Sequence, residues 1–370
     1  PQARVHFGVE AAATVTKEAE ALGAKRVWIA SSRSLNTKTD AVAKMAAALG
    51  PRYAGTFDGI REHSNLASVF EATHSARAAG ADLLVSVGGG TIIDGLKIVQ
   101  IALAENIQSL DALLAIANTA RTAPLKIRQI AVPTTLSGAE TSSPAGGTDS
   151  ASGRKHFYLH RDAIPLAIIY DPALGALTPK DLWFSSAIRG VDHCCEGVLS
   201  RRAHPVHDAG LLHALRLFAP SLRTTMQDPS NLAAREQRQV AAFIACHNSS
   251  RAGSGASHGL GYILGPRYGL GHGHTSCLVL PHVMRWNAVM SQDKQRELAA
   301  ALGRPTMSLG DAVSELVRDL GQPHRLRDVG VKREDLAAVA DEAAKHPVVL
   351  TNPRPITGPK DVLEILEPAW

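Results

Sequence analysis

Cysteines and long apolar runs are scarce in this chain, and each shortage excludes a class of protein. Only four of the 370 residues are cysteines, and Cys194 and Cys195 are adjacent while the other two lie far along the chain. This pattern fits neither a disulfide scaffold nor a CxxC zinc or redox site. No run approaches the ~18 apolar residues of a membrane span, and the opening PQARVHFGVE lacks the basic and apolar regions of a secretory signal. We therefore expect a cytoplasmic protein with no membrane segment.

Aromatic residues are also few, and this argues against a nucleic-acid partner. They make up 4% of the chain, which carries 39 Lys and Arg against 34 Asp and Glu, a formal charge of +5. The positive charges are scattered, and no basic run is interleaved with aromatics as in nucleic-acid-binding surfaces. We expect a small-molecule substrate instead.

The chain has enough hydrophobic residues, 45%, to bury a large core, and its length suggests two domains. In the first half, short apolar runs predict strands at 26–30, 82–87 and 127–132. Helical patterns alternate with them at 15–22, 41–49, 66–79 and 92–104. This alternation predicts an α/β domain with a doubly wound parallel sheet.

From about residue 182 the pattern changes to Ala- and Leu-rich segments at helical spacing, such as 208–218, 235–246 and 308–320. Strand signals become rare there, which predicts an all-α domain. We expect an α/β domain over residues 1–165 and a helical domain over 166–370.

Three glycines, Gly88, Gly89 and Gly90, lie between a predicted strand and a predicted helix, in VSVGGGTIIDGLK. Such a turn lets backbone N–H groups approach a phosphate and directs a helix N-terminus at it. It is neither G-x-G-x-x-G nor a Walker loop, and a tight turn that needs positive φ explains the glycines equally well. Asp94 can likewise act as an acid that favours the helix dipole.

A second motif, VPTTLSGAETSS (132–143), follows the next predicted strand. Open α/β sheets bind ligands at the carboxyl ends of their strands, so this hydroxyl-rich loop is a candidate binding segment. The alternative is a polar loop whose hydroxyls cap the next helix.

A third group of residues carries acid–base or metal-binding chemistry. In RGVDHCCE, Arg189, His193 and Glu196 share one face of a predicted helix. His258 and the pair His272 and His274 follow in glycine-rich segments, and about half of the 16 histidines lie between 193 and 282. We predict a shared polar pocket that binds a metal or transfers protons without one.

Four motifs follow one another in the order GGGTIIDGLK, PTTLSGAE, DHCCEGVLS and SHGLGYILG…GHGHTSCLVLPHVMRWN. Together they resemble the motifs of the iron-containing alcohol dehydrogenases, especially those of the maleylacetate reductase branch. The resemblance covers nearly the whole chain, down to TNPRPITGPKDVLEIL. It implies a dehydroquinate synthase-like architecture, a nucleotide domain followed by a helical catalytic domain. It also implies hydride transfer between a nicotinamide cofactor and an alcohol or carbonyl, and a homodimer.

The resemblance further implies which residues bind NAD(P)H. Gly88, Gly89 and Gly90 would cradle the pyrophosphate. The other residues implied at the cofactor are Ser32, Thr91, Asp94, Lys97, Thr134, Thr135, Leu136, Ser137 and Lys155. Where NAD-preferring relatives often have an acid, this chain reads Ala-Ser-Ser-Arg (30–33). With no carboxylate to repel a 2′-phosphate, we expect NADPH to be tolerated and NADH not to be excluded.

The chain departs from the family at the metal site. The family has an Asp four residues before a first His ligand, and two later His. His193, His258 and His272 match the three His, but Arg189 stands at the Asp position. A guanidinium offers no lone pair and repels a cation by about 4 kcal/mol per unit charge at ~4 Å and an effective dielectric constant near 20.

We therefore predict no tightly bound iron or zinc; if a metal binds, His193, His258 and His272 are its expected ligands. An alternative register places Asp192 on the Asp and Glu196 on the first His, which gives two carboxylates and two His.

Without a metal, Arg189 would polarise the substrate carbonyl or hold a substrate carboxylate. His193, His258 or His272 would deliver the proton that accompanies hydride transfer. We predict an NAD(P)H-dependent reductase of a carbonyl or oxo-acid substrate. The alternatives are a structural salt bridge from Arg189 to Glu196 or Asp192, a metal-dependent (Fe or Zn) alcohol dehydrogenase, and a non-redox enzyme on the dehydroquinate synthase-like scaffold.

Overall fold

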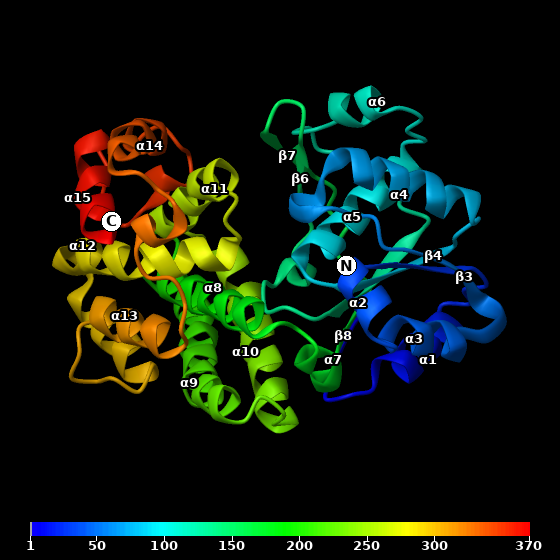
Figure 1. Cartoon of the computed structure of the whole chain (residues 1–370), viewed down its shortest axis with the longest axis horizontal. Helices are drawn as coiled ribbons and strands as arrows, with labels where there is room; N and C mark the ends of the chain where they lie inside the picture. Colours follow the sequence, from blue (N-terminus) through cyan, green and yellow to red (C-terminus); the bar gives the residue numbers. More distant parts are fainter. Residues whose placement is uncertain (1) are drawn as a thin grey trace. The chain divides into compact units, whose positions relative to one another are not determined.

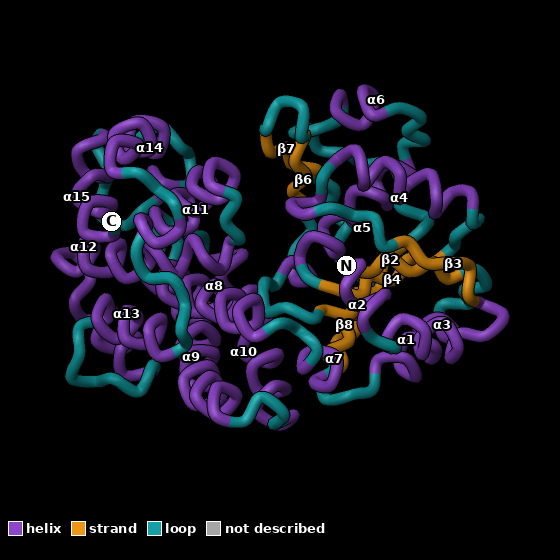
Figure 2. Tube along the Cα trace, viewed as in Figure 1, coloured by secondary structure: helices purple, strands orange, loops and turns teal. Residues whose placement is uncertain are grey.

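Six parallel strands form the sheet of the N-terminal part, in the order β1-β8-β5-β4-β2-β3. The computed structural model describes residues 2–370. The strands are β1 (Arg4–Phe7), β2 (Val27–Ser31), β3 (Tyr53–Phe57), β4 (Leu83–Gly88), β5 (Arg128–Pro133) and β8 (Ala167–Tyr170), drawn orange in Figure 2. Every neighbouring pair is parallel, which confirms the predicted sheet.

Helices cover both faces of this sheet because its strands are apolar on both sides. In β2, Trp28 packs into one hydrophobic cluster with residues of α4 (Leu66–Ala78) and α5 (Gly90–Ala104). Its neighbour Ile29 packs into another with α1 (Ala11–Ala21) and α3 (Ala41–Leu49). Successive side chains of a strand point to opposite faces, so two separate cores are expected of a doubly wound sheet. Figure 1 shows these two helix pairs on opposite sides of the strands.

Short elements complete the N-terminal part. They are α2 (Arg33–Lys38), α6 (Leu110–Ala115), α7 (Pro172–Ala176), the 3-10 turns η1 (Gly50–Arg52), η2 (Glu62–Ser64) and η3 (Ala139–Thr141), and a hairpin of β6 (Ala145–Asp149) and β7 (Arg154–Tyr158).

The chain divides between Thr178 and Pro179 into two compact units. The sequence placed this boundary earlier, after residue 165, before β8 and α7. Both elements belong to the first unit because β8 is fully buried and lies in the sheet between β1 and β5.

The second unit is helical, as predicted. Its helices are α8 (Lys180–Leu199), α9 (Pro205–Gln227), α10 (Leu232–Ala252), α11 (Ala256–Tyr268), α12 (His272–Ala301), α13 (Leu309–Asp319), α14 (Leu336–Ala343) and α15 (Pro359–Ala369). The described residues 179–370 contain no strand.

Helix α8 lies at the centre of the second unit. It packs against α9, α10 and α12 and is buried almost all round from Trp183 to Leu199. A helix buried on every side belongs to the core, so its polar residues must find partners there. No helix within residues 2–370 is long and apolar enough to cross a membrane.

Candidate active site

The glycine turn and the hydroxyl-rich loop lie side by side in the first unit, at the carboxyl ends of two adjacent strands. Gly88 ends β4 opposite Pro133, which ends β5. The Thr134 N–H donates to the Gly88 carbonyl at 3.0 Å. The two motifs therefore meet at the edge of a parallel sheet where such folds bind ligands.

Close packing explains why the turn needs glycine. A Cβ on Gly89 would lie 2.9 Å from the Thr135 Cγ2, and one on Gly90 would lie 3.0 Å from the Ser137 Oγ. Gly89 is also the N-cap of the 15-residue helix α5 and has no side chain to cap it. The turn thus brings a helix N-terminus, with its partial positive charge, to the ligand-binding edge of the sheet.

Ser32 and Thr91 lie close to this turn. The Ser32 N–H donates to the Val87 carbonyl at 3.3 Å, so Ser32 follows β2 at the same sheet edge. Its hydroxyl accepts from the Leu35 N–H and caps α2. The Thr91 carbonyl, in the first turn of α5, accepts the Ser64 hydroxyl at 2.9 Å.

Lys97 of α5 hydrogen-bonds to the hydroxyl-rich loop that follows β5. Its side chain is fully buried, and Nζ donates to Asp94 Oδ1 (2.9 Å), to the Ala139 carbonyl (2.6 Å) and to the Pro144 carbonyl (3.2 Å). The other oxygen of Asp94 accepts the Gly146 N–H at 3.2 Å. The assignment of Lys97 to the cofactor motif stays a prediction; in the structure its side chain has no exposed surface and fastens the loop to α5.

The remaining predicted cofactor residues differ in how far they are exposed. Thr134, Thr135 and Leu136 are buried, whereas Ser137 and Lys155 are half-buried. The Thr135 hydroxyl donates to the Ser137 hydroxyl at 3.3 Å. On β7 the Lys155 side chain runs over Gly146, where an added Cβ would lie 2.5 Å from its Cε.

The sequence analysis missed Glu140, a fully buried carboxyl in this loop. The Tyr170 hydroxyl donates to Glu140 Oε1 at 2.6 Å. Burial raises the pKa of Glu140 above its usual value, although the Tyr170 hydrogen bond and the Lys97 charge oppose it.

In the second unit, Asp192 on α8 is the centre of a buried polar network. Its Oδ2 accepts the Ser257 hydroxyl at 2.7 Å and the Ser276 hydroxyl at 2.6 Å. Arg189 Nη1 lies 3.5 Å from the same oxygen and donates to Ser276 at 3.1 Å. Burial alone would raise the pKa of Asp192, but the positive charges of His258 and Arg189 hold it well below the usual value.

Glu196, one turn further along α8, caps another helix. It accepts backbone N–H groups of Gly255 and Ser257 at 2.7 Å each and of His258 at 3.3 Å, all at the start of α11. Gly255, the N-cap of α11, has no side chain that could do this. The carboxylate therefore satisfies donors at a helix N-terminus and gains from its dipole.

A hydrogen-bonded chain leads from Glu196 towards the surface. His258 Nδ1 lies 2.7 Å from Glu196 Oε2, and its Nε2 lies 2.9 Å from His193 Nδ1. Burial and the Arg189 charge lower the pKa of His258, but Asp192 and Glu196 outweigh them and raise it overall. His258 is buried and His193 is half-buried, so the order Glu196–His258–His193 suits proton transfer towards solvent.

Of the predicted catalytic residues, Arg189, His193 and His258 belong to this network. His272, the first residue of α12, lies edge-on to the Tyr262 ring, with centroids 5.9 Å apart. His274 is not part of it: its Nε2 lies 2.9 Å from Asp181. Ser257, Ser276 and Tyr262 were missed, although Tyr262 is four residues after His258 and therefore on the same helix face.

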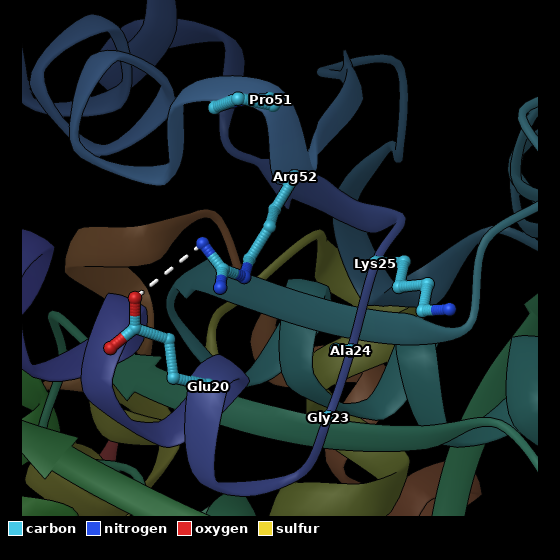
Figure 3. A pocket seen from close by; sticks show the side chains of 6 residues that line it. All are labelled: Glu20, Gly23, Ala24, Lys25, Pro51 and Arg52. Atoms are coloured by element: carbon cyan, nitrogen blue, oxygen red, sulfur yellow. Dashed lines mark ion pairs between the residues drawn. The ribbon is translucent and has the colours of Figure 1, made fainter.

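One surface hollow lies away from all these residues. It has a volume of about 510 Å³ and is lined by Glu20, Gly23, Ala24, Lys25, Pro51 and Arg52, as Figure 3 shows. Glu20 and Arg52 form an ion pair across it at 3.4 Å. It contains none of the predicted site residues.

Comparison with known families identifies the class of protein. Residues 1–172 match the model of iron-containing alcohol dehydrogenases, and residues 186–370 match the C-terminal model of the same family. The chain therefore belongs to the iron-containing alcohol dehydrogenase family and is an oxidoreductase acting on CH–OH or C=O groups.

Within the family, the chain is similar to maleylacetate reductases among other enzymes. It is 30% identical to maleylacetate reductase 1 of Rhodococcus opacus, covering 100% of this chain and 94% of that one. It is 31% identical to dehydrogenase ALT3 of Alternaria alternata, covering 94% and 99%.

Solved structures of relatives share the fold. Maleylacetate reductase from Agrobacterium tumefaciens has a TM-score of 0.85 at 27% identity, covering 100% and 96% of the two chains. Alcohol dehydrogenase from Oenococcus oeni has a TM-score of 0.90 at 27% identity, covering 100% and 98%. The dehydroquinate synthase-like architecture is thereby confirmed.

The residues at the family's metal position offer donors to a divalent cation, but they also include a positive charge that opposes it. Potential ligand atoms of Asp192, Glu196 and His258 lie within 4.8 Å of one another and are buried. All three belong to the set of two carboxylates and two His that the alternative register predicts, whereas only His258 belongs to the set His193, His258 and His272. However, Glu196 already accepts three backbone N–H groups, Asp192 Oδ2 accepts two hydroxyls, and the Arg189 cation lies 3.5 Å away. A metal on Glu196 or on Asp192 Oδ2 would have to displace these donors and approach a fixed positive charge, whereas Asp192 Oδ1 has no hydrogen-bond partner among the described residues.

Proposed function

We propose that this protein reduces a small carbonyl or oxo-acid substrate with NADH or NADPH, without a tightly bound metal. The observation that carries the proposal is the guanidinium of Arg189, which supplies a fixed positive charge inside the acid–histidine network. The similarity to maleylacetate reductases supports an oxo acid as the substrate class.

In this proposal the first unit binds the nucleotide. The N-terminus of α5 and the glycine turn receive the pyrophosphate, and the Thr134–Ser137 loop lines the same edge. Near Ser32, Arg33 lies 3.9 Å from Asp58, which follows β3. Because a cation and an acid are both present there, we expect both NADPH and NADH to bind.

The reaction transfers a hydride and a proton. A bound NADH or NADPH would supply the hydride to the carbonyl carbon, with the C=O π electrons moving onto oxygen. His193 gives a proton to that oxygen, and His258, hydrogen-bonded to Glu196, passes a proton on to His193. The products are the alcohol and oxidised nucleotide.

Arg189 would stabilise the developing negative charge on that oxygen, or hold a carboxylate of the substrate. It donates one hydrogen bond to Ser276, and its Nε and Nη2 make none with residues 2–370. Those N–H groups remain available to a substrate oxygen, which distinguishes this role from a purely structural ion pair.

A metal-dependent alcohol dehydrogenase is the second candidate, and the buried group of Asp192, Glu196 and His258 favours it. Metal analysis of protein purified without chelators separates the two candidates. We also expect a cytoplasmic homodimer, which light scattering and fractionation test.

Consumption of NADH and NADPH against a panel of aldehydes, ketones and oxo acids tests the activity itself. We expect oxidation of the nucleotide with at least one oxo acid. A lyase or isomerase on the same scaffold would consume neither nucleotide, and that result would contradict the proposal.

A further inference from the structure

The segment 349–354, near the end of the chain, packs against the start of α11. Gly259 of α11 has no side chain, and an added Cβ there would lie 2.4 Å from Val349 Cγ2. The Thr351 hydroxyl donates to the Ser254 carbonyl at 2.8 Å, just before the helix begins. This segment therefore contacts a helix of the acid–histidine network, although it has no role in the function proposed above.

The four backbone N–H groups at the start of α11, those of residues 255–258, need partners outside the helix, because the first intrahelical hydrogen bond is donated by Gly259. Glu196 accepts three of the four. Asn352 Oδ1 accepts the remaining one, from Ala256, at 3.2 Å. Two side chains from other segments thus hold the start of this helix.

Asn352 is fixed in this orientation by a second buried amide, that of Asn287 on α12. Asn352 Nδ2 donates to Asn287 Oδ1 at 2.7 Å, and Asn287 Nδ2 donates to Asn352 Oδ1 at 3.2 Å. Asn352 Nδ2 also donates to the Arg354 carbonyl at 2.8 Å. Asn352 is 0% exposed, so it cannot turn away from α11 without leaving buried polar groups unpaired.

The start of α11 is also where the proton relay of the proposed mechanism lies. His258 is the third residue of the helix, and its ring lies between Glu196 of α8, at 2.7 Å, and His193 of α8, at 2.9 Å. A shift of α11 against α8 would lengthen both hydrogen bonds. Proton transfer needs its partners at hydrogen-bond distance, so such a shift would slow it.

We propose that Asn352 is a positioning residue for this relay. By accepting the Ala256 N–H it holds the first turn of α11, and with it the His258 ring, at hydrogen-bond distance from His193. Asn352 acts through His258 and does not touch the substrate. The proposal rests on the proposed function, because proton transfer through His258 is part of that function.

The test compares Asn352→Leu with Gln295→Leu. Both changes replace a buried amide by an apolar side chain of similar size, but the Gln295 amide bonds within α12, to the Met284 carbonyl and the Ser291 hydroxyl. Both variants should lose stability. Only Asn352→Leu should lower kcat, by about tenfold, because a small displacement of a catalytic group slows its step. The KM for the nucleotide should stay unchanged.

Two further measurements separate positioning from a general loss of stability. The solvent deuterium isotope effect on kcat should rise in Asn352→Leu and not in Gln295→Leu, because only there does the proton step become slower. Amide hydrogen exchange over residues 255–258 reports on the helix start without turnover. It should become about tenfold faster in Asn352→Leu and stay unchanged in Gln295→Leu.

Thr351→Val is a milder second variant, at an exposed position that should allow it to fold. It removes the hydrogen bond to the Ser254 carbonyl beside the helix start. We expect kcat to fall about threefold and the same amides to exchange faster, since one neutral hydrogen bond is lost.

An unchanged kcat in folded Asn352→Leu, or an equal loss of kcat in Gln295→Leu, would overturn the positioning role. If Asn352→Leu does not fold, unchanged kcat and exchange in Thr351→Val would overturn it. Absence of nucleotide oxidation by the parent protein with every carbonyl would instead overturn the proposed function, and the exchange measurement would still decide whether Asn352 holds the start of α11.

Discussion

Arg189 is a buried cation that lies 3.5 Å from the Asp192 carboxylate, 3.1 Å from the Ser276 hydroxyl and 6.0 Å from the Tyr262 ring. A buried charge is tolerated when it is paired and hydrogen-bonded, and removal of one partner is costly. The arrangement explains why a buried arginine is stable at this position of α8. It leaves part of the guanidinium available for chemistry.

The first prediction concerns this guanidinium. Arg189→Ala should lower kcat/KM about ten- to a hundredfold, because a charge-assisted contact is worth about 1.5–3 kcal/mol. Steady-state kinetics measure the change, and circular dichroism shows whether the variant is folded. A folded Arg189→Ala protein with undiminished kcat/KM would exclude contact between Arg189 and the substrate.

The second prediction concerns the histidines. His193→Ala, His258→Ala and His272→Ala should each reduce turnover and leave nucleotide affinity largely intact, since these residues belong to the second unit and the nucleotide motif to the first. His274→Ala serves as the matched control because His274 pairs with Asp181 outside the network. Full turnover in all three variants would mean that the proton donor lies elsewhere.

The third prediction concerns His282 on α12 and the pH dependence of stability. Burial, with a smaller effect of Arg285, lowers the pKa of His282 to about 4. The unfolded chain then takes up a proton near pH 6.5 that the folded protein does not take up until about pH 4. The free energy of unfolding therefore falls as the pH falls through this window, by about 3 kcal/mol from this group.

His282→Gln removes that titration, so its stability should fall less between pH 6.5 and pH 4 than that of the parent. Urea denaturation at a series of pH values measures this difference. Parallel curves for the two proteins would refute the assignment.

At the scale of elements, the buried strands and long helices could be predicted and the edge strands could not. β2, β4 and β5 lie within one residue of their predicted bounds at each end, and α3 agrees at both ends. The edge strands β1 and β3 were missed, since they are short and half-exposed and so lack a continuous apolar run. β8 is buried but has only four residues, too short a run to predict a strand.

The site was predictable only where its residues share an element or follow a strand. The face of α8 with Arg189, His193 and Glu196 follows from helical spacing. Two other features of the site depend on how three helices pack, so the sequence pattern does not indicate them. Glu196 caps α11, and Ser257 and Ser276 both donate to Asp192. Likewise, no local pattern indicates that Lys97 is buried beneath the loop.

The fourth prediction concerns the glycine turn. Gly89→Val should weaken nucleotide binding sharply, because the new side chain would occupy space beside Thr135 and in front of the α5 N-terminus. Gly358→Val is the control: Gly358 is extended, and an added Cβ there meets nothing within 4 Å. Fluorescence titration with NADH and NADPH measures the affinity; unchanged values in a folded Gly89→Val protein would remove the turn from the nucleotide site.

At the scale of the whole molecule, each unit supplies one part of a redox enzyme. The first unit has the sheet edge and helix N-terminus that suit a dinucleotide, and the second has a buried acid–histidine network that suits proton transfer. The family membership establishes alcohol or carbonyl oxidoreduction. Our central claim is that this chain uses Arg189 in place of a metal.

Elemental analysis of the native protein and of Arg189→Asp, prepared identically without chelators, tests this claim most directly. Arg189→Asp adds a carboxylate one helical turn before His193, in the network that contains His258, and removes the repelling charge, so it should take up a divalent metal. We predict far less than one equivalent of iron or zinc in the native protein and close to one equivalent in Arg189→Asp. About one equivalent of iron or zinc in the native protein would contradict the account and favour a conventional metal-dependent alcohol dehydrogenase.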